Sequence, residues 1–331
     1  MSAPLVSIIV PTHNHGPTLR SAVSSALAQT HAELEVLIVG DGMPAEAAAA
    51  ARELEREHER VRLFEFEKGE RHGEAHRHEV LSNDARGEYV FYLCDDDLYL
   101  PGHVETLLAV LFYADFVSGT CCVTFPDNSL EIYPHDISRP YTRELMLSTR
   151  RQYSHAALSC ISHSMAAYRR LPKGWSPAPK GVRTDIHFVR KFVGSAETFH
   201  CLSVQRVTVI HLPSPTRLAM STEERATELD WWRKRIASAD GLAAIEAELE
   251  AAYRMRAVDA DLDYQLAHDH VHEAYDREAD MQRWMADLEA NAGRLERHIA
   301  AINALPELRL RRSRVGHGLL SARARLRRQK R

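Results

Sequence analysis

The sequence has few cysteines and no long apolar run. Its five cysteines among 331 residues form no CxxC pair, so we expect neither a disulfide framework nor a zinc site of paired cysteines. Free thiols favour a cytoplasmic protein. No stretch approaches the roughly 18 consecutive apolar residues of a membrane-spanning helix, and no basic segment with a cleavage site precedes the first apolar run. We therefore expect neither a spanning helix nor a signal peptide. Hydrophobic residues make up 45% of the chain, which suffices for a large core.

Two common phosphate-binding motifs are also missing. No GxGxxG follows the first apolar run, which argues against a dinucleotide-binding dehydrogenase, and no GxxxxGK[ST] occurs, which argues against a P-loop enzyme. A phosphatase with an aspartyl nucleophile would carry DxDxT, but Tyr99 stands where that threonine would follow Asp95. These three enzyme classes are therefore disfavoured.

The charge is unevenly distributed along the chain. Ten of the 42 Lys and Arg residues lie in residues 309–331, which contain no acid. The other 32 Lys and Arg residues and the 46 acidic residues give residues 1–308 a net charge of −14. We therefore expect no specific nucleic-acid partner. The basic tail, residues 306–331, either stays solvated or lies on an anionic membrane surface, where each basic residue contributes about 1 kcal/mol. The sequence thus favours a cytoplasmic protein and leaves open a peripheral position on the inner face of the membrane.

The first 110 residues alternate between short apolar runs and helix-forming stretches. The runs begin about 30 residues apart and cover residues 6–10, 34–39, 61–66 and 89–93. Unbroken apolar runs of this length are typical of buried parallel strands. The helix-forming stretches lie after Gly16-Pro17, in residues 44–59 and, more weakly, in residues 73–86. Strand, helix and strand at this spacing predict right-handed βαβ units and a doubly wound α/β sheet.

The remainder of the chain is less regular. Residues 116–125 and 202–210 indicate strands, and residues 171–181 form a loop rich in proline and glycine. Residues 222–304 contain no proline and only two glycines, which predicts long helices. Within them, apolar residues spaced by four and three form a heptad stripe over residues 281–302. This stripe either packs on its own chain or pairs with a second copy in a homodimer.

Polar residues follow each of the four apolar runs. Ligands of open parallel sheets bind beyond the carboxyl ends of the strands, so we expect these groups to meet in one crevice. The four segments are PTHN (residues 11–14), GDG (40–42), KGER (68–71) and DDD (95–97). Three consecutive carboxylates raise one another's pKa unless a cation compensates them, and Mg²⁺ is a natural compensator. A solvated acidic turn is the alternative, but the position at a strand end favours a metal.

These motifs, in this order, resemble those of the family-2 glycosyltransferases. The resemblance covers roughly residues 4–110 and is carried by four segments: VSIIVPTHN (6–14), AVSSALAQT (22–30), EVLIVGDG (35–42) and ARGEY (85–89), which leads into DDD. It implies a GT-A type, Rossmann-like, doubly wound mixed sheet with a C-terminal helical extension. It also implies inverting, divalent-metal-dependent transfer of a hexosyl-type sugar from a nucleoside diphosphate sugar, usually UDP-linked, to a hydroxyl acceptor. The acceptor would be a glycan or a lipid-linked molecule of surface polysaccharide or glycolipid assembly.

The resemblance also implies a domain organisation. We expect a GT-A catalytic domain over residues 1–218, with a nucleotide-sugar-binding half (1–110) and an acceptor-binding half (111–218). A long-helix extension (219–305) and the basic tail (306–331) would follow.

Residue by residue, the resemblance places the donor nucleotide beside the first two strands. It implies that the nucleotide sugar is bound by Pro11, Thr12, Asn14 and Asp41, with Gly40 where the family usually has a first aspartate. Arg77 matches a basic residue near the nucleotide, although a one-residue slip would select His78 instead. Asp95 is expected to face the ribose or the donor sugar.

The metal and the catalytic base come from later motifs. The resemblance implies that Mn²⁺ or Mg²⁺ is bound chiefly by Asp96, which also contacts the donor, with Asp97 and His211 as further ligands. A TD pair that opens a helix matches the family's catalytic base at Asp185, although an acid stabilised by the helix dipole is the alternative. Thr184 is expected to line the acceptor side, and Trp175 either stacks on an acceptor sugar or fills the core.

A catalytically inactive member of the family is the alternative function. Such a protein would be a scaffold or nucleotide-binding module acting through its C-terminal helices, and Gly40 in place of aspartate is the feature in its favour. Release of nucleotide from a UDP-sugar in the presence of Mn²⁺ or Mg²⁺ distinguishes the two.

Overall fold

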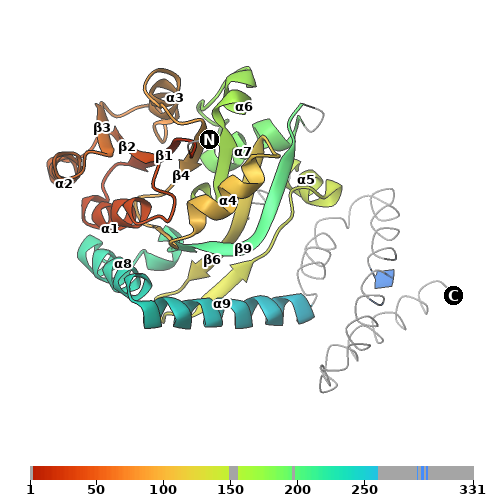
Figure 1. The fold of residues 1–331 in the computed structure, drawn as a ribbon. Helices are drawn as coiled ribbons and strands as arrows, with labels where there is room; N and C mark the ends of the chain where they lie inside the picture. Colours follow the sequence, from red (N-terminus) through yellow and green to blue (C-terminus); the bar gives the residue numbers. More distant parts are fainter. Residues whose placement is uncertain are drawn as a thin grey trace. The chain divides into compact units, whose positions relative to one another are not determined.

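The computed structural model describes residues 3–148, 156–195 and 198–259, together with residues 289, 292, 293 and 296. The chain divides into two compact units, Met1–Leu249 and Glu250–Arg331. All of the site described below lies in the first unit, whose described strands form a nine-stranded mixed sheet (Figure 1).

The N-terminal half of the sheet is parallel, as predicted. Its strands lie side by side in the order β3 (Val61–Phe66), β2 (Leu34–Asp41), β1 (Val6–Thr12) and β4 (Tyr89–Tyr92). Every residue of β2 and all but one of β1 are buried, because helices cover both strands, and this explains the unbroken apolar runs. The connecting helices are α1 (Gly16–Leu27), α2 (Ala45–Glu57) and α3 (Glu74–Asn83).

The rest of the sheet is mixed. Beyond β4 the order continues with β8 (Ile161–Ser164), β6 (Phe116–Thr124), β9 (Cys201–His211) and β5 (Leu98–Tyr99), while β7 (Leu130–Tyr133) pairs with β6. The β4–β8 and β8–β6 pairs are antiparallel, and β6 and β9 are parallel. Both long strands of this half, β6 and β9, agree with the prediction. The helical segments are α4 (His103–Leu111), α5 (Pro140–Leu147), η1 (Leu158–Cys160), α6 (Met165–Arg170), α7 (Thr184–Val193) and η2 (Ser214–Arg217).

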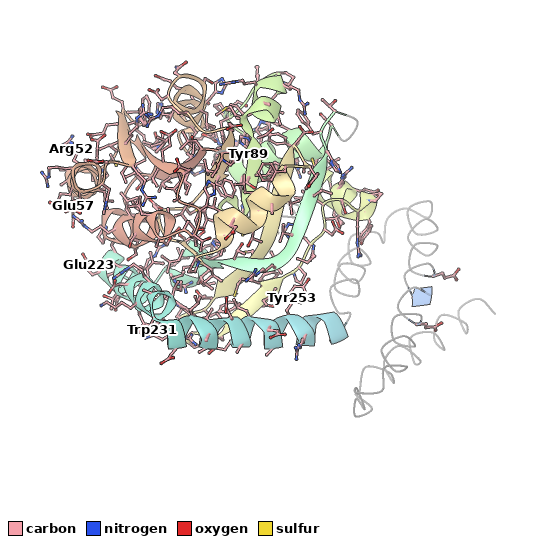
Figure 2. The ribbon with its side chains drawn as sticks, viewed as in Figure 1. Arg52, Glu57, Tyr89, Glu223, Trp231 and Tyr253 are labelled. Atoms are coloured by element: carbon pink, nitrogen blue, oxygen red, sulfur yellow. The ribbon has the colours of Figure 1, made fainter. Side chains whose placement is uncertain are left out.

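Two helices follow the sheet. Helix α8 (Thr222–Ala237) begins with a capping box between Ser221 and Glu224 and packs against α1. Helix α9 spans Ala239–Asp259. Leu229 and Trp232 of α8 are buried, whereas Glu223 and Trp231 lie at its outer surface (Figure 2). Apolar side chains from both halves of the sheet pack against the helices and form the hydrophobic core.

The heptad stripe of residues 281–302 and the basic tail of residues 306–331 lie outside the described residues, apart from four isolated positions in the stripe. Homodimer formation and membrane association therefore stay predictions. Among the residues that the structure describes, no helix is both long and apolar enough to span a membrane.

Candidate active site

The polar segments predicted to meet do lie at one edge of the sheet. Thr12 ends β1, Asp41 ends β2, and the three aspartates follow β4 after two residues. Strand β1 lies between β2 and β4 and is parallel to both, so the carboxyl ends of the three strands share this edge. Pro11 precedes Thr12 in the chain, and Asn14 follows it by two residues. Asn14 is exposed and Pro11 is partly buried.

Asp41 is a buried carboxylate surrounded by donors. Lys68 forms an ion pair with Oδ2, the backbone N–H of Gly69 donates to Oδ1 over 2.6 Å, and His76 Nε2 lies 3.5 Å from Oδ1. Burial opposes ionisation, but the hydrogen bonds from Lys68 and Gly69 outweigh it and hold the pKa of Asp41 below its usual value. Gly73 permits this enclosure, because its left-handed backbone (φ 69°) brings the turn before α3 so close that a Cβ would lie 2.8 Å from the Asp41 carboxyl carbon.

Gly40, the departure from the family pattern, is enclosed by a neighbouring side chain. A Cβ at this position would lie 2.4 Å from Met43 Cε. The methionine therefore occupies the space that a first aspartate would need.

Thr12 and Arg77 present buried polar atoms to this edge. Thr12 Oγ1 and the Nε and Nη2 atoms of Arg77 have no hydrogen-bond partner among the described residues. The Arg77 guanidinium stacks over the Trp175 ring, 4.5 Å from its centroid. Burial lowers the pKa of Arg77, while the carboxylates of Glu74 and Asp41 act in the opposite direction. Trp175 bonds to Tyr92 at the end of β4, and Gly73, which precedes α3, lies against Asp41 at the end of β2. Arg77, on α3 and over Trp175, is therefore near the ends of both strands.

His78 was the alternative to Arg77 as the basic residue near the nucleotide, but its side chain contacts a different part of the protein. Its Nδ1 is 2.7 Å from the Tyr168 hydroxyl, and its ring lines a cavity of about 590 Å³ between α3, α6 and residues 171–177. The structure thus brings Arg77, and not His78, to the edge that carries Thr12 and Asp41.

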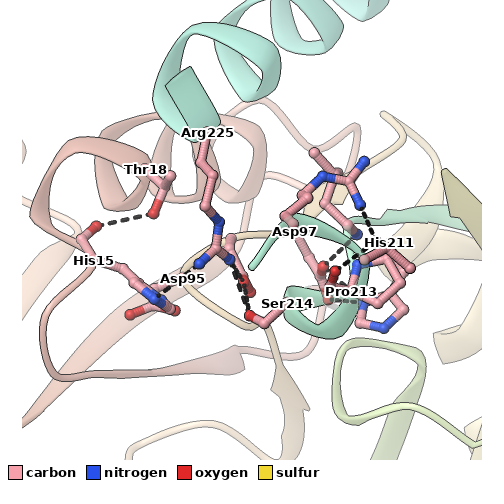
Figure 3. Close-up of polar contacts among 12 residues, drawn as sticks. His15, Thr18, Asp95, Asp97, His211, Pro213, Ser214 and Arg225 are labelled. Carbon is pink, nitrogen blue, oxygen red and sulfur yellow. Dashed lines mark hydrogen bonds and ion pairs between the residues drawn. The ribbon is translucent and has the colours of Figure 1, made fainter. Parts of the chain in front are cut away.

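The three aspartates differ in their surroundings. Asp97 is fully buried: Ser159 Oγ donates to its Oδ2 over 2.5 Å, and the Leu212 N–H donates to its Oδ1 over 3.1 Å. His211 Nδ1 lies 2.8 Å from Oδ1 (Figure 3). Burial alone would lower the pKa of His211, but the Asp97 carboxylate raises it to about 10, and the same contacts lower the pKa of Asp97. Asp97 therefore anchors His211.

Asp96 and Asp95 have partners of another kind. Asp96 Oδ2 accepts hydrogen bonds from Arg225 Nη2 of α8 over 2.6 Å and from Ser214 Oγ over 3.1 Å. Burial, together with the neighbouring carboxylates of Asp97 and Asp95, raises the pKa of Asp96 to about 7. Asp95 Oδ1 lies 3.0 Å from His15 Nδ1, and this hydrogen bond raises the pKa of His15.

The aspartates and their neighbours supply a donor set that fits a divalent cation. Among the described residues, two groups of three ligand atoms lie within 4.8 Å of one another: His15, Asp95 and Asp96, and Cys94, Asp96 and Asp97. Asp96 is common to both. His211 belongs to neither group, but its ring is oriented by Asp97, the arrangement usual for a metal-binding histidine held by a carboxylate. Carboxylate oxygens are the ligands that Mn²⁺ and Mg²⁺ prefer.

Asp185 lies in the first turn of α7, as predicted, and its side chain is 16% exposed. Arg183 Nη2 is 3.2 Å from its Oδ2. The preceding Thr184 donates its hydroxyl to Glu74 Oε1 over 2.7 Å, and Glu74 is fully buried at the start of α3. Arg71 donates to the carbonyls of residues 178, 179 and 182. The start of α7 is therefore fastened to the β3–α3 loop that also encloses Asp41.

Trp175 is buried, and both faces of its ring are covered. Phe188 stacks on it at 3.8 Å between ring centroids, and Arg77 lies over it. Its Nε1 donates to the Tyr92 hydroxyl over 3.0 Å. Of the two roles left open by the sequence, filling the core matches this geometry, and neither ring face is available to an acceptor sugar in this structure.

Sequence reasoning did not single out several residues of this edge. Four such residues belong to no recognisable motif: His15, Glu74, Ser214 and Arg225. Their roles come from tertiary contacts with Asp95, Thr184 and Asp96. A weak signal existed only for His15, because it directly follows a strand-end segment already expected to bind ligand.

Comparison with known proteins identifies the class to which this fold and site belong. The sequence model described as Glycosyl transferase family 2 matches residues 7–172, half of the chain. The protein therefore belongs to glycosyltransferase family 2 and has a mixed α/β fold of the GT-A type.

Individual relatives match shorter stretches. An uncharacterized glycosyltransferase of Rickettsia bellii (strain RML369-C) is 37% identical over 108 residues, which cover 33% of this chain and 15% of the relative. The uncharacterized glycosyltransferase YwdF of Bacillus subtilis (strain 168) is 28% identical over 50% of this chain and 58% of the relative. The crystal structure of S. aureus TarS aligns with a TM-score of 0.50 and 16% identity over 72% of this chain and 43% of that one, a likeness of fold. This chain thus spans less than two thirds of the length of these relatives.

Proposed function

We propose that the protein is an inverting, divalent-metal-dependent glycosyltransferase that moves a hexosyl group from a nucleoside diphosphate sugar to a hydroxyl acceptor. One observation carries the proposal: Thr12, Asp41, Arg77 and Asp96 come from four separate segments to the same edge of the sheet. Buried unpartnered donors beside a carboxylate cluster suit a ligand that is both hydrogen-bonding and anionic.

In this proposal the donor nucleotide lies along the ends of β1 and β2. The ionised Asp41 carboxylate is positioned by Lys68 and Gly69 to accept hydrogen bonds from the N–H of a base, with uracil as the proposed base. Thr12 Oγ1 offers a donor or acceptor beside it, with Pro11 and Asn14 flanking it. The unpartnered N–H groups of Arg77 would contact the anionic part of the donor, and Asp95 its ribose or sugar.

The proposed cation, Mn²⁺ or Mg²⁺, would be held by Asp96 and His211. Asp97, whose oxygens already accept hydrogen bonds from Ser159 and Leu212, would orient His211 and complete the ligand set only by a change of partners. When bound, such an ion offsets the charge that develops on a diphosphate leaving group. His15 is a further ligand candidate, because its ring lies with Asp95 and Asp96.

Asp185 is the proposed general base. A carboxylate accepts a proton from a hydroxyl only when the two are in hydrogen-bond reach, so its position decides the role. The contact between Thr184 and Glu74 joins the start of α7 to α3, and in this proposal Asp185 would lie on the acceptor side of the donor edge. Attack of the acceptor oxygen from the face opposite the diphosphate would invert the anomeric carbon.

The wider setting is part of the same proposal. The catalytic domain would extend over residues 1–218, followed by the helical extension and the basic tail. The acceptor would be a glycan or lipid-linked molecule of polysaccharide or glycolipid assembly, and the protein would be cytoplasmic. Pairing through the heptad stripe and contact of the tail with an anionic membrane are further proposals for the same chain.

A catalytically inactive scaffold is the second candidate, favoured by Gly40 in place of an acid. A screen of UDP-, GDP- and dTDP-sugars with Mn²⁺, read as nucleotide release, distinguishes the two. We expect slow release from one donor class, lost in Asp96→Ala. Release from none of them, with no thermal shift by any of the nucleotides, would favour the scaffold.

A further inference from the structure

Helix α8 contributes a cation to the cluster of aspartates. Arg225, in the first turn of this helix, is 14% exposed and reaches Asp96, Ser214 and His15. Its Nη2 donates to Asp96 Oδ2 over 2.6 Å and to Ser214 Oγ over 2.9 Å, and its Nη1 lies 3.4 Å from His15 Nε2. Figure 3 shows the side chain extending from α8 into the space between His15 and Ser214. Arg225 lies outside residues 7–172, the part of the chain that the family model matches.

The guanidinium lies against residues that could hold a metal ion. His15 and Asp96 are two members of a three-residue group whose ligand atoms lie within 4.8 Å of one another, and Arg225 contacts both. A cation bound to Asp96 at about 2.1 Å would stand next to the guanidinium, on a carboxylate oxygen that already accepts two hydrogen bonds. Arginine keeps its charge at every accessible pH, so it cannot yield by losing a proton. It can yield only by moving.

Phosphate oxygens offer the Arg225 side chain an alternative partner. Arg225 has a long flexible stem, and a guanidinium binds phosphate oxygens with two parallel hydrogen bonds. A nucleoside diphosphate brings negative charge to the site at the same time as the metal brings positive charge. When Arg225 leaves, the Ser214 hydroxyl still donates to Asp96, and its oxygen no longer accepts from the guanidinium.

We propose that Arg225 is an internal counter-cation of the donor site, which occupies the metal position on Asp96 until metal and nucleotide bind together, and which then binds the donor diphosphate. The proposal rests on the proposed function, since it takes Asp96 as the metal ligand. Its consequence is that metal alone binds weakly, because it must displace Arg225 without offering it another anion. Metal and nucleotide together bind strongly.

The test measures Mn²⁺ binding directly, from the spectroscopic signal of free Mn²⁺, in the full-length protein with and without UDP or GDP. In Arg225→Gln we expect Mn²⁺ alone to bind about ten- to a hundredfold more tightly than in the unaltered protein, the range expected for loss of a competing charged hydrogen bond. The increase in Mn²⁺ affinity on addition of nucleotide should be smaller in the variant. Arg233→Gln is the matched control, because Arg233 lies on the same helix and pairs with Asp230.

Equal affinity of Arg225→Gln and the unaltered protein for Mn²⁺ alone would overturn the proposal, and so would absence of Mn²⁺ binding by both. If Arg225→Gln does not fold, Arg225→Lys replaces it. Lysine retains the positive charge but lacks the guanidinium that donates to both Asp96 and Ser214. We therefore expect an intermediate gain in Mn²⁺ affinity. Failure of the proposed function gives a different result: the unaltered protein then binds no nucleotide, whatever the Mn²⁺ affinity of the variants.

Discussion

Asp96 and Asp97 are neighbours in the chain and identical in chemistry, yet their contacts give them different roles. Asp97 points into the protein and is held by Ser159, His211 and the backbone of Leu212. Asp96 points to the edge of the sheet, where Arg225 and Ser214 reach it. No pattern in the sequence DDD distinguishes these surroundings, because they are made by residues about 60 to 130 positions away along the chain.

The first prediction follows from this difference. Asp97→Asn should lower the free energy of unfolding by about 3–5 kcal/mol, because it breaks the ion pair between a fully buried carboxylate and the partly buried His211. Asp96→Asn should change stability less, because repulsion from Asp95 and Asp97 offsets the ion pair with Arg225 that the substitution removes. It should instead abolish metal-dependent nucleotide binding. Urea denaturation measures the first effect and calorimetric titration the second. Equal stability loss in both variants would show that the assignment of roles is wrong.

The second prediction concerns the proposed base. Asp185→Asn should reduce the rate of sugar transfer by about 10²–10⁴-fold, the usual contribution of a general base, and leave donor affinity within about twofold. The rate is measured with saturating donor and acceptor. Asp240→Asn is a matched control, since Asp240 also lies in the first turn of a helix, α9, and is exposed. Full transfer activity in Asp185→Asn removes this residue from the base role.

At the scale of elements, sequence patterns predicted what is long and locally consistent. The four parallel strands and the helices between them were confirmed, because buried apolar runs and helix-forming stretches are continuous there. Strands β5, β7 and β8 have two to four residues, too few for a period to be visible, and exist because longer strands pair with them. Helix α8 was predicted as a helix, but its position over the aspartates is set by tertiary contacts.

One of those contacts carries the third prediction. Arg217, at the end of η2, is fully buried; it pairs with Glu228 of α8 and donates to the Thr124 carbonyl of β6 over 3.0 Å. Arg217→Met should destabilise the protein by about 3–5 kcal/mol, because Glu228 loses its partner in a nearly buried position. Adding Glu228→Leu should recover part of this loss, since the unpaired charge is then gone. Urea denaturation of the single and double variants checks both. A double variant less stable than Arg217→Met would contradict the account.

At the scale of the whole molecule, buried histidines set the acid limit of stability. Burial lowers the pKa of His103 to about 3 and of His135 and His163 to about 4. The unfolded chain binds protons at these residues near pH 6.5, and the folded protein does not. The stability that they contribute is therefore complete above pH 6.5 and is lost as the pH falls towards 4.

The fourth prediction uses that window. Between pH 6 and 5 the three histidines should together lower the free energy of unfolding by about 3.5 kcal/mol, or roughly 1.2 kcal/mol each. His211 changes the effect little, because its raised pKa keeps it protonated in the folded protein and an ordinary histidine of the unfolded chain is mostly protonated below pH 6. His103→Gln should reduce the slope of stability against pH by about one third. An unchanged slope, from denaturation curves at each pH, would show that His103 is protonated in the folded protein.

The site as a whole was only partly visible in the sequence. The ends of β1, β2 and β4 meet because parallel strands share an edge, so Thr12, Asp41 and the aspartates could be placed together in advance. The partners that set their charge, such as Lys68 on Asp41 and Arg225 on Asp96, depend on side-chain directions in three dimensions. Trp175 shows the same limit, since a tryptophan among prolines does not reveal that Phe188 and Arg77 cover its ring.

The most direct test of the central claim is a crystal structure of the protein with Mn²⁺ and the nucleoside diphosphate that the donor screen selects. We predict the base beside Thr12 and Asp41, the diphosphate within hydrogen-bond distance of Arg77, and Mn²⁺ on Asp96. A nucleotide bound instead in the cavity lined by His78 and Tyr168, or Mn²⁺ bound away from Asp96, would contradict the account.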